Sequence, residues 1–155
     1  MILGVTTADN PRHAAPAVSV VITSHNSGVF LARAVRSVLA QTFDDYEIVV
    51  IDDGSAVPQP EIAELDPRIR FHAQPNRGVS VARNVGVALA GADLIAFLDH
   101  DDVWYPTKLE RQLEQVARIP EAAFWCTGFD WVRGDASTPS TLSTLDYPTM
   151  LRRSE

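Results

Sequence analysis

Short apolar segments alternate with amphipathic segments along most of this chain. Four runs rich in β-branched residues are typical of buried strands and cover residues 18–22, 46–51, 69–73 and 93–98. Residues 29–41 and 79–90 repeat apolar residues at helical spacing, and Pro106 is expected in the first turn of a third such segment. The apolar stripes of the three expected helices are Leu31, Val35 and Val38; Val81, Val85 and Leu89; and Leu109, Leu113 and Val116. Strands that alternate with helices predict an α/β domain with a mostly parallel sheet flanked by helices.

The segments outside this alternation differ from it in composition. Residues 1–16 lack the basic start and the long apolar core of a secretion signal, and we expect them to form a flexible leader. The domain itself is expected to span residues 17–133, with residues 122–132 as one further strand. Residues 134–155 are rich in Ser, Thr, Pro and Asp and show no hydrophobic period, so they predict a loop.

Composition and charge exclude several classes of function. A chain of 155 residues that is 46% hydrophobic can bury one core, and its net charge of -7 leaves no basic surface for nucleic acid. The single cysteine, Cys126, rules out an internal disulfide, and its apolar neighbours predict that it is buried. No apolar stretch approaches the ~20 residues of a membrane-spanning helix. We therefore expect a cytoplasmic protein, at most peripheral at the inner face of the membrane.

Polar residues follow three of the four predicted strands, at the point where each strand ends. They are Thr23 to Asn26 after the first strand, Asp52 and Asp53 at the second, and Asp99 to Asp102 after the fourth. In an open parallel sheet, ligands bind beyond the carboxyl ends of the strands. We therefore expect these three groups to converge on one edge of the sheet.

The chemistry of the acidic group indicates a metal site for phosphate. The chain has neither a Gly-x-Gly-x-x-Gly loop nor a Gly-x-x-x-x-Gly-Lys loop, so phosphate needs another means of binding. Asp99 and Asp101 are separated by one residue, and carboxylate oxygens are the ligands that Mg²⁺ and Mn²⁺ prefer. The alternative is an acidic turn that caps the helix after Pro106. Three neighbouring carboxylates repel one another unless a cation compensates, which favours the metal site.

Three segments resemble glycosyltransferases of family 2 in their order and spacing: residues 18–26, 48–55 and 97–104. The resemblance extends over about residues 18–132. It implies a GT-A (Rossmann-like) fold that ends before the acceptor-binding half, with residues 134–155 as a loop or the start of that half. It also implies a nucleotide-diphosphate sugar (UDP-, GDP- or dTDP-linked) as donor, Mn²⁺ or Mg²⁺ as cofactor, and a carbohydrate or lipid-linked acceptor.

The resemblance also implies roles for individual residues. The set for the nucleotide sugar is Thr23, His25, Asn26, Asp52, Asp53, Arg83 and Asp99, and the set for the metal is Asp101, Asp99 and Asp102. In these sets Thr23 and His25 would contact the nucleoside and Asp53 the base. Arg83 would contact the base or the diphosphate, and Asp99 the ribose or the metal. Family members usually carry Pro in place of Thr23 and Tyr in place of His25, so stacking on the base would be weaker here.

Each of these roles has a structural alternative. Thr23 and Asn26 could cap the first helix, and Asp53 could hydrogen-bond its own turn. Arg83 could be a solvated helix residue. The reaction implied is inverting and needs a general base, which the family supplies downstream of the acidic motif. The acidic residues well after the third helix lie in no segment that resembles the base-bearing motif, and we assign no base; they are Asp130, Asp135, Asp146 and Glu155.

Three functions therefore stay open at this point. The first is the donor-binding half of a glycosyltransferase, and the second is a non-catalytic nucleotide-sugar-binding module that lacks the base. The third is a metal phosphohydrolase, although the acidic motif stands later in the chain than that chemistry usually places it. The aromatic residues Phe124, Trp125, Phe129 and Trp131 would either form a surface for self-association into a homo-oligomer or pack on the chain's own helices.

Overall fold

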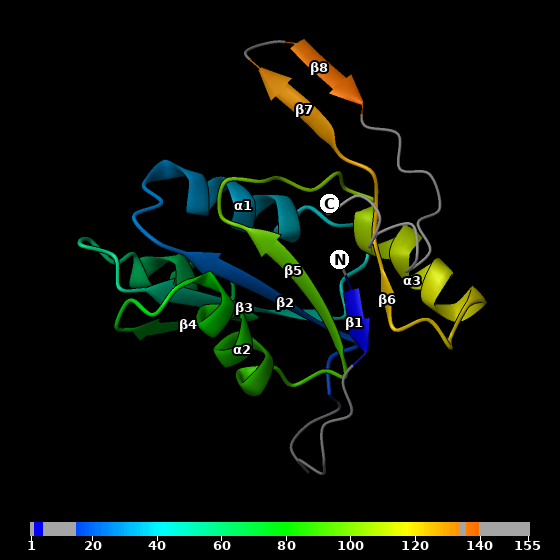
Figure 1. Ribbon diagram of the computed structural model, residues 1–155, viewed down its shortest axis with the longest axis horizontal. Helices are drawn as coiled ribbons and strands as arrows, with labels where there is room; N and C mark the ends of the chain where they lie inside the picture. The colour runs from blue at the N-terminus through cyan, green and yellow to red at the C-terminus, as the bar shows by residue number, and fades with distance from the viewer. Residues whose placement is uncertain (1, 5–14, 134–135, 140–155) are drawn as a thin grey trace, which may run out of the picture. The chain divides into compact units, whose positions relative to one another are not determined.

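The computed structural model describes residues 2–4, 15–133 and 136–139, which fall into two units. The first unit, residues 1–125, contains one six-stranded sheet with the strand order β4-β3-β2-β5-β1-β6 (Figure 1). Its strands are β1 (Ile2–Gly4), β2 (Val18–Ser24), β3 (Tyr46–Asp53), β4 (Ile69–Gln74), β5 (Leu94–Asp99) and β6 (Phe124–Trp125). Its helices are α1 (Val29–Leu39), the short 3₁₀ helix η1 (Pro60–Glu64), α2 (Val79–Leu89) and α3 (Lys108–Arg118). The α/β class and the mostly parallel sheet expected from the sequence are confirmed.

Four neighbouring strands of the sheet, β2 to β5, run parallel. Their register aligns the last residues of the strands, because Ser24 pairs with Asp52 and Thr23 pairs with Asp99. Asp53 pairs in turn with Gln74 at the end of β4. The polar residues that the sequence places after separate strands therefore stand at one edge.

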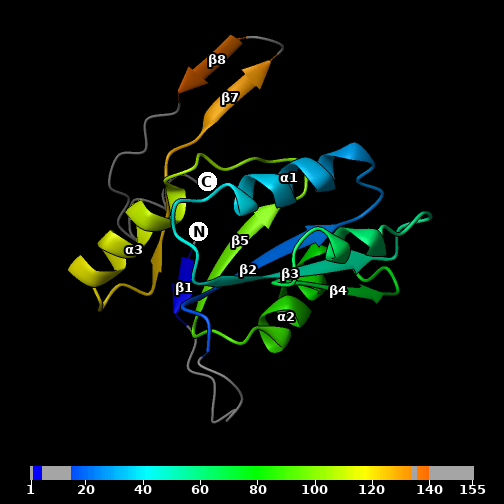
Figure 2. The same cartoon turned by 180° about the vertical axis from the view of Figure 1, so that it is seen from behind.

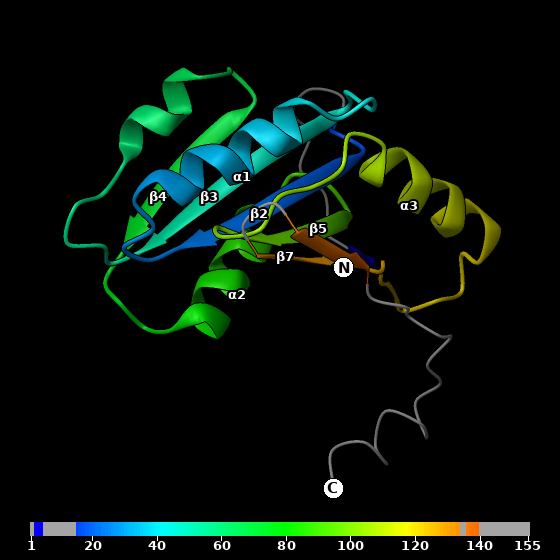
Figure 3. The same cartoon turned by 90° about the horizontal axis from the view of Figure 1, so that it is seen from above.

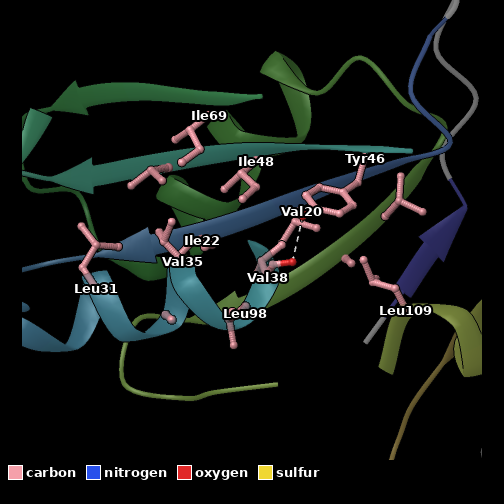
Figure 4. Close-up of a cluster of buried hydrophobic side chains, with 14 of the residues drawn as sticks. Val20, Ile22, Leu31, Val35, Val38, Tyr46, Ile48, Ile69, Leu98 and Leu109 are labelled. Atoms are coloured by element: carbon pink, nitrogen blue, oxygen red, sulfur yellow. Dashed lines mark hydrogen bonds between the residues drawn. The ribbon is translucent and has the colours of Figure 1, made fainter. Parts of the chain in front are cut away.

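Two apolar layers hold the sheet, one on each face. Alternate residues of β2 serve the two faces: Val20 and Ile22 pack in the cluster that includes α1 and α3, while Val21 packs in the cluster that includes Ala82 of α2. Figure 3 shows α1 and α3 on one side of the sheet and α2 on the other. Figure 4 shows the larger cluster, in which the Tyr46 hydroxyl also donates a 2.9 Å hydrogen bond to the Val38 carbonyl.

The face that α2 turns to the sheet differs from the predicted one. Its buried residues are Ala82 and Gly86, whereas Leu89 of the predicted stripe is 36% exposed. The reason is the short distance between the helix and the sheet, since a Cβ atom at Gly86 would lie 2.3 Å from Cγ1 of Val21. The small residues Ala82 and Gly86 therefore determine which face of α2 packs on the sheet, and the larger residues of the helix lie beside this contact.

Four smaller expectations also need correction. Residues 2–4 lie in the segment predicted as a flexible leader, yet they form β1, which pairs antiparallel with β5 and β6 (Figure 2). Residues 122–132 contribute to two strands rather than one, because β6 ends at Trp125. Cys126, just beyond that end, is exposed rather than buried. Pro106 precedes α3, which begins at Lys108, and does not lie in its first turn.

The second unit, residues 126–155, contains a hairpin of β7 (Asp130–Arg133) and β8 (Ala136–Pro139). β8 lies in a segment that the sequence predicts as a loop. The rings of Phe129 and Trp131 meet edge to face at 5.3 Å, and both side chains are exposed. In the first unit Phe124 is exposed and Trp125 is buried, so only Trp125 packs in the chain's own core. None of the helices in the described part of the chain is long and apolar enough to cross a membrane.

Candidate functional site

The carboxyl ends of β2, β3 and β5 bring together the polar groups predicted from the sequence. Residues 25–28 lead from β2 into α1, and residues 54–59 lead from β3 to η1. A chain of hydrogen bonds connects these two loops, from Ser24 to Ser27 at 2.8 Å and from Ser27 to Gln59 at 3.2 Å. Side-chain hydrogen bonds therefore hold the loops after β2 and β3 together at this edge.

Asp53 is the most strongly held acidic residue at this edge. Its carboxylate accepts hydrogen bonds from the Gln74 side chain at 2.7 Å and from the amides of Arg77 and Gly78 at 2.9 and 2.8 Å. Burial raises the pKa of Asp53, but these three donors outweigh burial and hold the pKa below its ordinary value. The side chain is only 5% exposed. Asp53 therefore joins the end of β3 to the loop before α2.

The turn after β3 is closed by Asp52, not by Asp53. The Asp52 carboxylate accepts hydrogen bonds from the amide of Ser55 at 3.3 Å and from the Ser55 hydroxyl. The alternative in which Asp53 bonds its own turn is therefore not what the structure shows. Asp52 is also buried, so its carboxylate supports the loop from beneath.

His25 and Asn26 connect the β2 loop to the β3 loop. The Nδ1 atom of His25 lies 2.9 Å from the Asp53 carbonyl oxygen, and its Nε2 atom lies 2.9 Å from Nδ2 of Asn26. Asn26 has a φ of 50°. Its backbone amide donates a hydrogen bond to the Ser55 hydroxyl at 2.8 Å, and its Oδ1 atom accepts one from the Ala56 amide at 2.9 Å. Gly28 is the N-cap of α1 and no side chain caps that helix, so Asn26 is not a helix cap.

Thr23 lies beneath the site and is only 6% exposed. It too makes no cap to α1. Its carbonyl oxygen lies 3.3 Å from Nδ1 of His100, which begins the loop after β5. This contact ties the acidic loop to the end of β2.

Arg83 on α2 forms an ion pair with Asp99 at the end of β5, with 2.6 Å between the guanidinium nitrogen and the carboxylate oxygen. The guanidinium carbon also lies 6.0 Å from the centroid of the Phe97 ring. Both charged side chains remain partly exposed, at 39% and 45%. Arg83 is therefore paired with the first aspartate of the acidic loop and is not simply a solvated helix residue.

The remaining acidic residues, Asp101 and Asp102, are exposed on the loop after β5. The amide of Asp102 donates to the Asp99 carbonyl at 3.1 Å, which folds the three aspartates into one turn. Partial burial raises the pKa of Asp102, and the Asp101 and Asp99 carboxylates add to the rise against the effect of His100. Among the described residues, no group of three or more His, Cys, Asp or Glu side chains is placed to hold a metal by itself.

The far end of the acidic loop is anchored to the end of α1. The Trp104 amide donates to the Ser37 hydroxyl at 3.0 Å. The Gln41 side chain donates to the Tyr105 carbonyl at 2.8 Å and accepts the Leu109 amide at 2.9 Å. Gln41, which lies just after α1, thus binds the first turn of α3.

Sequence reasoning missed two kinds of residue at this site. Gln74 is the last residue of β4 and Asn76 follows in the next loop, and the rule that found the other three polar groups at strand ends would have found them as well. Asn76 places Nδ2 3.3 and 3.4 Å from the two ring nitrogens of His25. Gln41 carries no comparable signal, because the end of a predicted helix does not indicate which loop it contacts.

Comparisons with known proteins agree with this architecture. The family model "Glycosyl transferase family 2" matches residues 19–153. An uncharacterized glycosyltransferase of Nostoc is 42% identical over 102 residues, which are 63% of this chain and 32% of the relative. The chain thus spans about a third of that relative's length.

Two solved structures share the fold at lower sequence identity. Staphylococcus aureus TarS 1-349 in complex with UDP-GlcNAc matches with a TM-score of 0.61 and 24% identity, over 65% of this chain and 31% of that chain. The mannosyltransferase PcManGT of Pyrobaculum calidifontis, in complex with GDP-Man and Mn²⁺, matches with a TM-score of 0.61 and 21% identity, over 68% of this chain and 33% of that chain. With the family match over most of its length and a sheet of the GT-A type, this chain belongs to glycosyltransferase family 2.

Proposed function

We propose that this chain binds a nucleotide-diphosphate sugar together with Mn²⁺ or Mg²⁺ and supplies the donor-binding half of an inverting glycosyl transfer. The observation that carries the proposal is the alignment of Thr23, Asp52 and Asp99 by the register of β2, β3 and β5. Membership of the family supports transfer of a sugar in general. The ligands of the two solved structures, UDP-GlcNAc in one and GDP-Man with Mn²⁺ in the other, support a donor of this class.

The nucleoside would bind over the loops after β2 and β3. Thr23, His25, Asn26, Asp52 and Asp53 form this end of the site. The first two would face the nucleoside, and Asp53 would approach the base. Asp53 has little exposed surface, and three donors of the protein hydrogen-bond its carboxylate. The carboxylate oxygen that would contact the base is therefore already fixed in position. Such preorganisation lowers the entropic cost of binding.

The diphosphate would bind at the acidic turn. A site that offers Asp99, Asp101 and Asp102 in one turn but no complete set of ligands suits Mg²⁺ or Mn²⁺, which are commonly shared between one or two carboxylates and substrate phosphates. The mutual repulsion of these carboxylates is the electrostatic reason for a cation to bind there. Arg83 would bring a second positive charge to the same diphosphate.

In an inverting transfer, a bond forms between the acceptor oxygen and the anomeric carbon while the bond to the diphosphate oxygen breaks. A bound cation supplies Lewis-acid stabilisation of the charge that develops on the leaving diphosphate. Arg83 and the acidic turn orient that diphosphate. The base that takes the proton of the acceptor hydroxyl is assigned to no residue of this chain.

Thermal unfolding of the purified chain with UDP, GDP, dTDP or CDP, each with and without Mn²⁺, tests the proposal. A ligand at about a hundred times its dissociation constant stabilises by about 2.7 kcal/mol, so a shift for one nucleotide that requires Mn²⁺ is expected. Asp101→Asn should abolish that shift.

The matched control is Asp45→Asn, which removes an exposed carboxylate at the opposite end of the sheet and should leave the shift intact. Metal-dependent nucleotide binding that survives Asp101→Asn would contradict the assigned site. Binding without any turnover of the sugar nucleotide would favour the non-catalytic binding module.

A further inference from the structure

His25 makes a hydrogen bond that determines where its proton lies. Its Nδ1 atom is 2.9 Å from the carbonyl oxygen of Asp53. A carbonyl oxygen only accepts hydrogen bonds, so Nδ1 carries the hydrogen. The ring donates from this nitrogen to the end of β3.

The second ring nitrogen faces an amide whose orientation is fixed. Oδ1 of Asn26 accepts the Ala56 amide at 2.9 Å, so the atom that Asn26 presents to the imidazole is Nδ2. An amide nitrogen only donates, and it lies 2.9 Å from Nε2 of His25. Nε2 must therefore offer a lone pair, which makes the ring neutral with its hydrogen on Nδ1.

Asn76 occupies a different position around the same ring. Its Nδ2 atom is nearly equidistant from the two ring nitrogens, at 3.3 and 3.4 Å. A position in the ring plane at those distances would collide with Cε1 between the nitrogens, so the Asn76 amide lies over one face of the imidazole. His25 belongs to the loop after β2 and thus touches the end of β3 and the loop after β4.

The charged groups on the elements around His25 are few. They are Asp52 and Asp53 at the end of β3 and Arg77 in the loop before α2. Both carboxylates already accept hydrogen bonds. Asp52 accepts from Ser55, and Asp53 accepts from the amides of Arg77 and Gly78. Neither of them bonds the imidazole itself. Whether Nε2 can accept the hydrogen bond from Asn26 therefore depends on the protonation state of the ring itself.

We infer that His25 is a positioning residue that joins the three loops of the nucleotide site only as the neutral Nδ1–H imidazole, and that its protonation releases them. A protonated ring would turn Nε2 into a donor that faces the donating Nδ2 of Asn26. Turning over the Asn26 amide to relieve this conflict would break its hydrogen bond with the Ala56 amide. The consequence for nucleotide binding rests on the proposed function.

The state of the ring can be measured without any ligand. In the ¹⁵N-labelled chain at about pH 7.5, the imidazole shifts of His25 should show a protonated Nδ1 and an unprotonated Nε2, and acidification to about pH 5.5 should broaden or shift the amides of Asn26 and Ala56. His72, an exposed residue of β4, provides the control as His72→Gln, which should leave these signals unchanged. An Nε2–H tautomer or a doubly protonated ring at the higher pH would overturn the inference.

The second experiment compares nucleotide affinity at the two pH values in the presence of Mn²⁺. The wild-type chain should bind the nucleotide more weakly at the lower pH than at the higher pH. This loss of affinity should exceed the corresponding loss in His25→Tyr by about tenfold, because protonation removes about one hydrogen bond to the ring. Asn26→Asp should remove or reverse this extra loss, because a carboxylate at that position accepts from a protonated Nε2 while its other oxygen keeps the Ala56 amide. Asp also tolerates the positive φ of this position.

The two experiments separate this inference from the proposed function. Absence of nucleotide binding at every pH would contradict the proposed function and leave the tautomer measurement to decide the inference. Nucleotide binding with the same pH dependence in the wild-type chain, His25→Tyr and Asn26→Asp would contradict the inference and leave the proposed function standing.

Discussion

Arg83 and Asp99 form an ion pair of 2.6 Å between α2 and the end of β5, so a carboxylate proposed for the cation already has a positive partner. The guanidinium repels a cation bound nearby and attracts a diphosphate, and these effects oppose each other. We predict that Arg83→Gln binds Mn²⁺ alone about three- to tenfold more tightly, and binds the nucleoside diphosphate with Mn²⁺ more weakly, as measured by calorimetric titration.

Arg70→Gln is the matched control for Arg83→Gln. Arg70 forms an ion pair with Glu47, also at 2.6 Å, but near the opposite end of the sheet. This change should leave both affinities unaltered. Weaker binding of Mn²⁺ to Arg83→Gln would instead show that Arg83 supports the metal site by holding Asp99 in position.

Gly86→Ala should destabilise the domain although alanine favours helices. The added Cβ would lie 2.3 Å from Cγ1 of Val21, inside the sheet–helix contact. Overpacking of this kind costs about 1–3 kcal/mol, which exceeds the about 0.5–1 kcal/mol that Ala gains over Gly in a helix. Urea denaturation of Gly86→Ala, with Asn84→Ala on the exposed side of α2 as control, measures the difference.

A double mutant identifies the contact responsible. Val21→Ala alone leaves a cavity, but combined with Gly86→Ala it should be more stable than the sum of the two changes by about 1 kcal/mol or more. Simple additivity would mean that α2 moves away from β2 to accept the methyl group.

The sequence predicts the general position of the site because parallel strands end at a common edge. Asp53 and Asp99 follow apolar runs whose length and composition specify buried strands, and the order of strands and helices specifies their direction. Little else is needed to bring the two carboxylates to the same side of the sheet. The observed register of β2, β3 and β5 confirms this step.

The partners of these residues could not be predicted, because they depend on the paths of loops. The bonds from Arg77 and Gly78 to Asp53 cross 24 and 25 residues of sequence and leave no pattern in it. The buried face of α2 was predicted only in part for a related reason: Val85 packs against the cluster, but Gly86 carries no hydrophobic signal and yet permits the close approach to β2. A strand of three residues such as β1 is too short for any periodicity to show.

Gln41 should affect the acidic loop from the end of α1. Its carboxamide donates to the Ser37 and Tyr105 carbonyls and accepts the Leu109 amide. Gln41→Met keeps the size of the side chain but removes the hydrogen bonds to the Tyr105 carbonyl and from the Leu109 amide; because both are at least partly exposed, each loss should cost about 0.5–1.5 kcal/mol. We predict a lower free energy of unfolding in urea and a weaker affinity for Mn²⁺.

The control for Gln41→Met is the same change at Gln115, an exposed residue of α3. It should leave stability and Mn²⁺ affinity within error of the wild-type values. Loss of stability in Gln41→Met with unchanged Mn²⁺ affinity would show that Gln41 holds α3 but has no effect on the acidic turn.

Lys108 is the only lysine of the chain, and its ammonium is buried at the start of α3. Nζ lies 3.5 Å from the centroid of the Trp104 ring and has no hydrogen-bond partner in the described part of the structure. Burial lowers the pKa of Lys108 to about 7 from an ordinary value of 10.5. Such a group is charged in the unfolded chain and neutral in the folded chain over the interval between these two values.

This difference in protonation gives the stability of the domain a definite dependence on pH. Between about pH 7 and pH 10.5 the unfolded chain binds one more proton than the folded chain, so stability should rise with pH by up to about 1.4 kcal/mol per unit, and it should be lowest and flat below that interval. Lys108→Met should remove this slope and raise the free energy of unfolding near pH 7 by a few kcal/mol. The ¹³Cε signal of the single lysine reports its titration directly, and urea denaturation of both chains across the interval reports the slope. An ordinary titration near pH 10.5, with no gain in stability for Lys108→Met, would mean that the attraction of the Trp104 ring for the ammonium outweighs its loss of hydration.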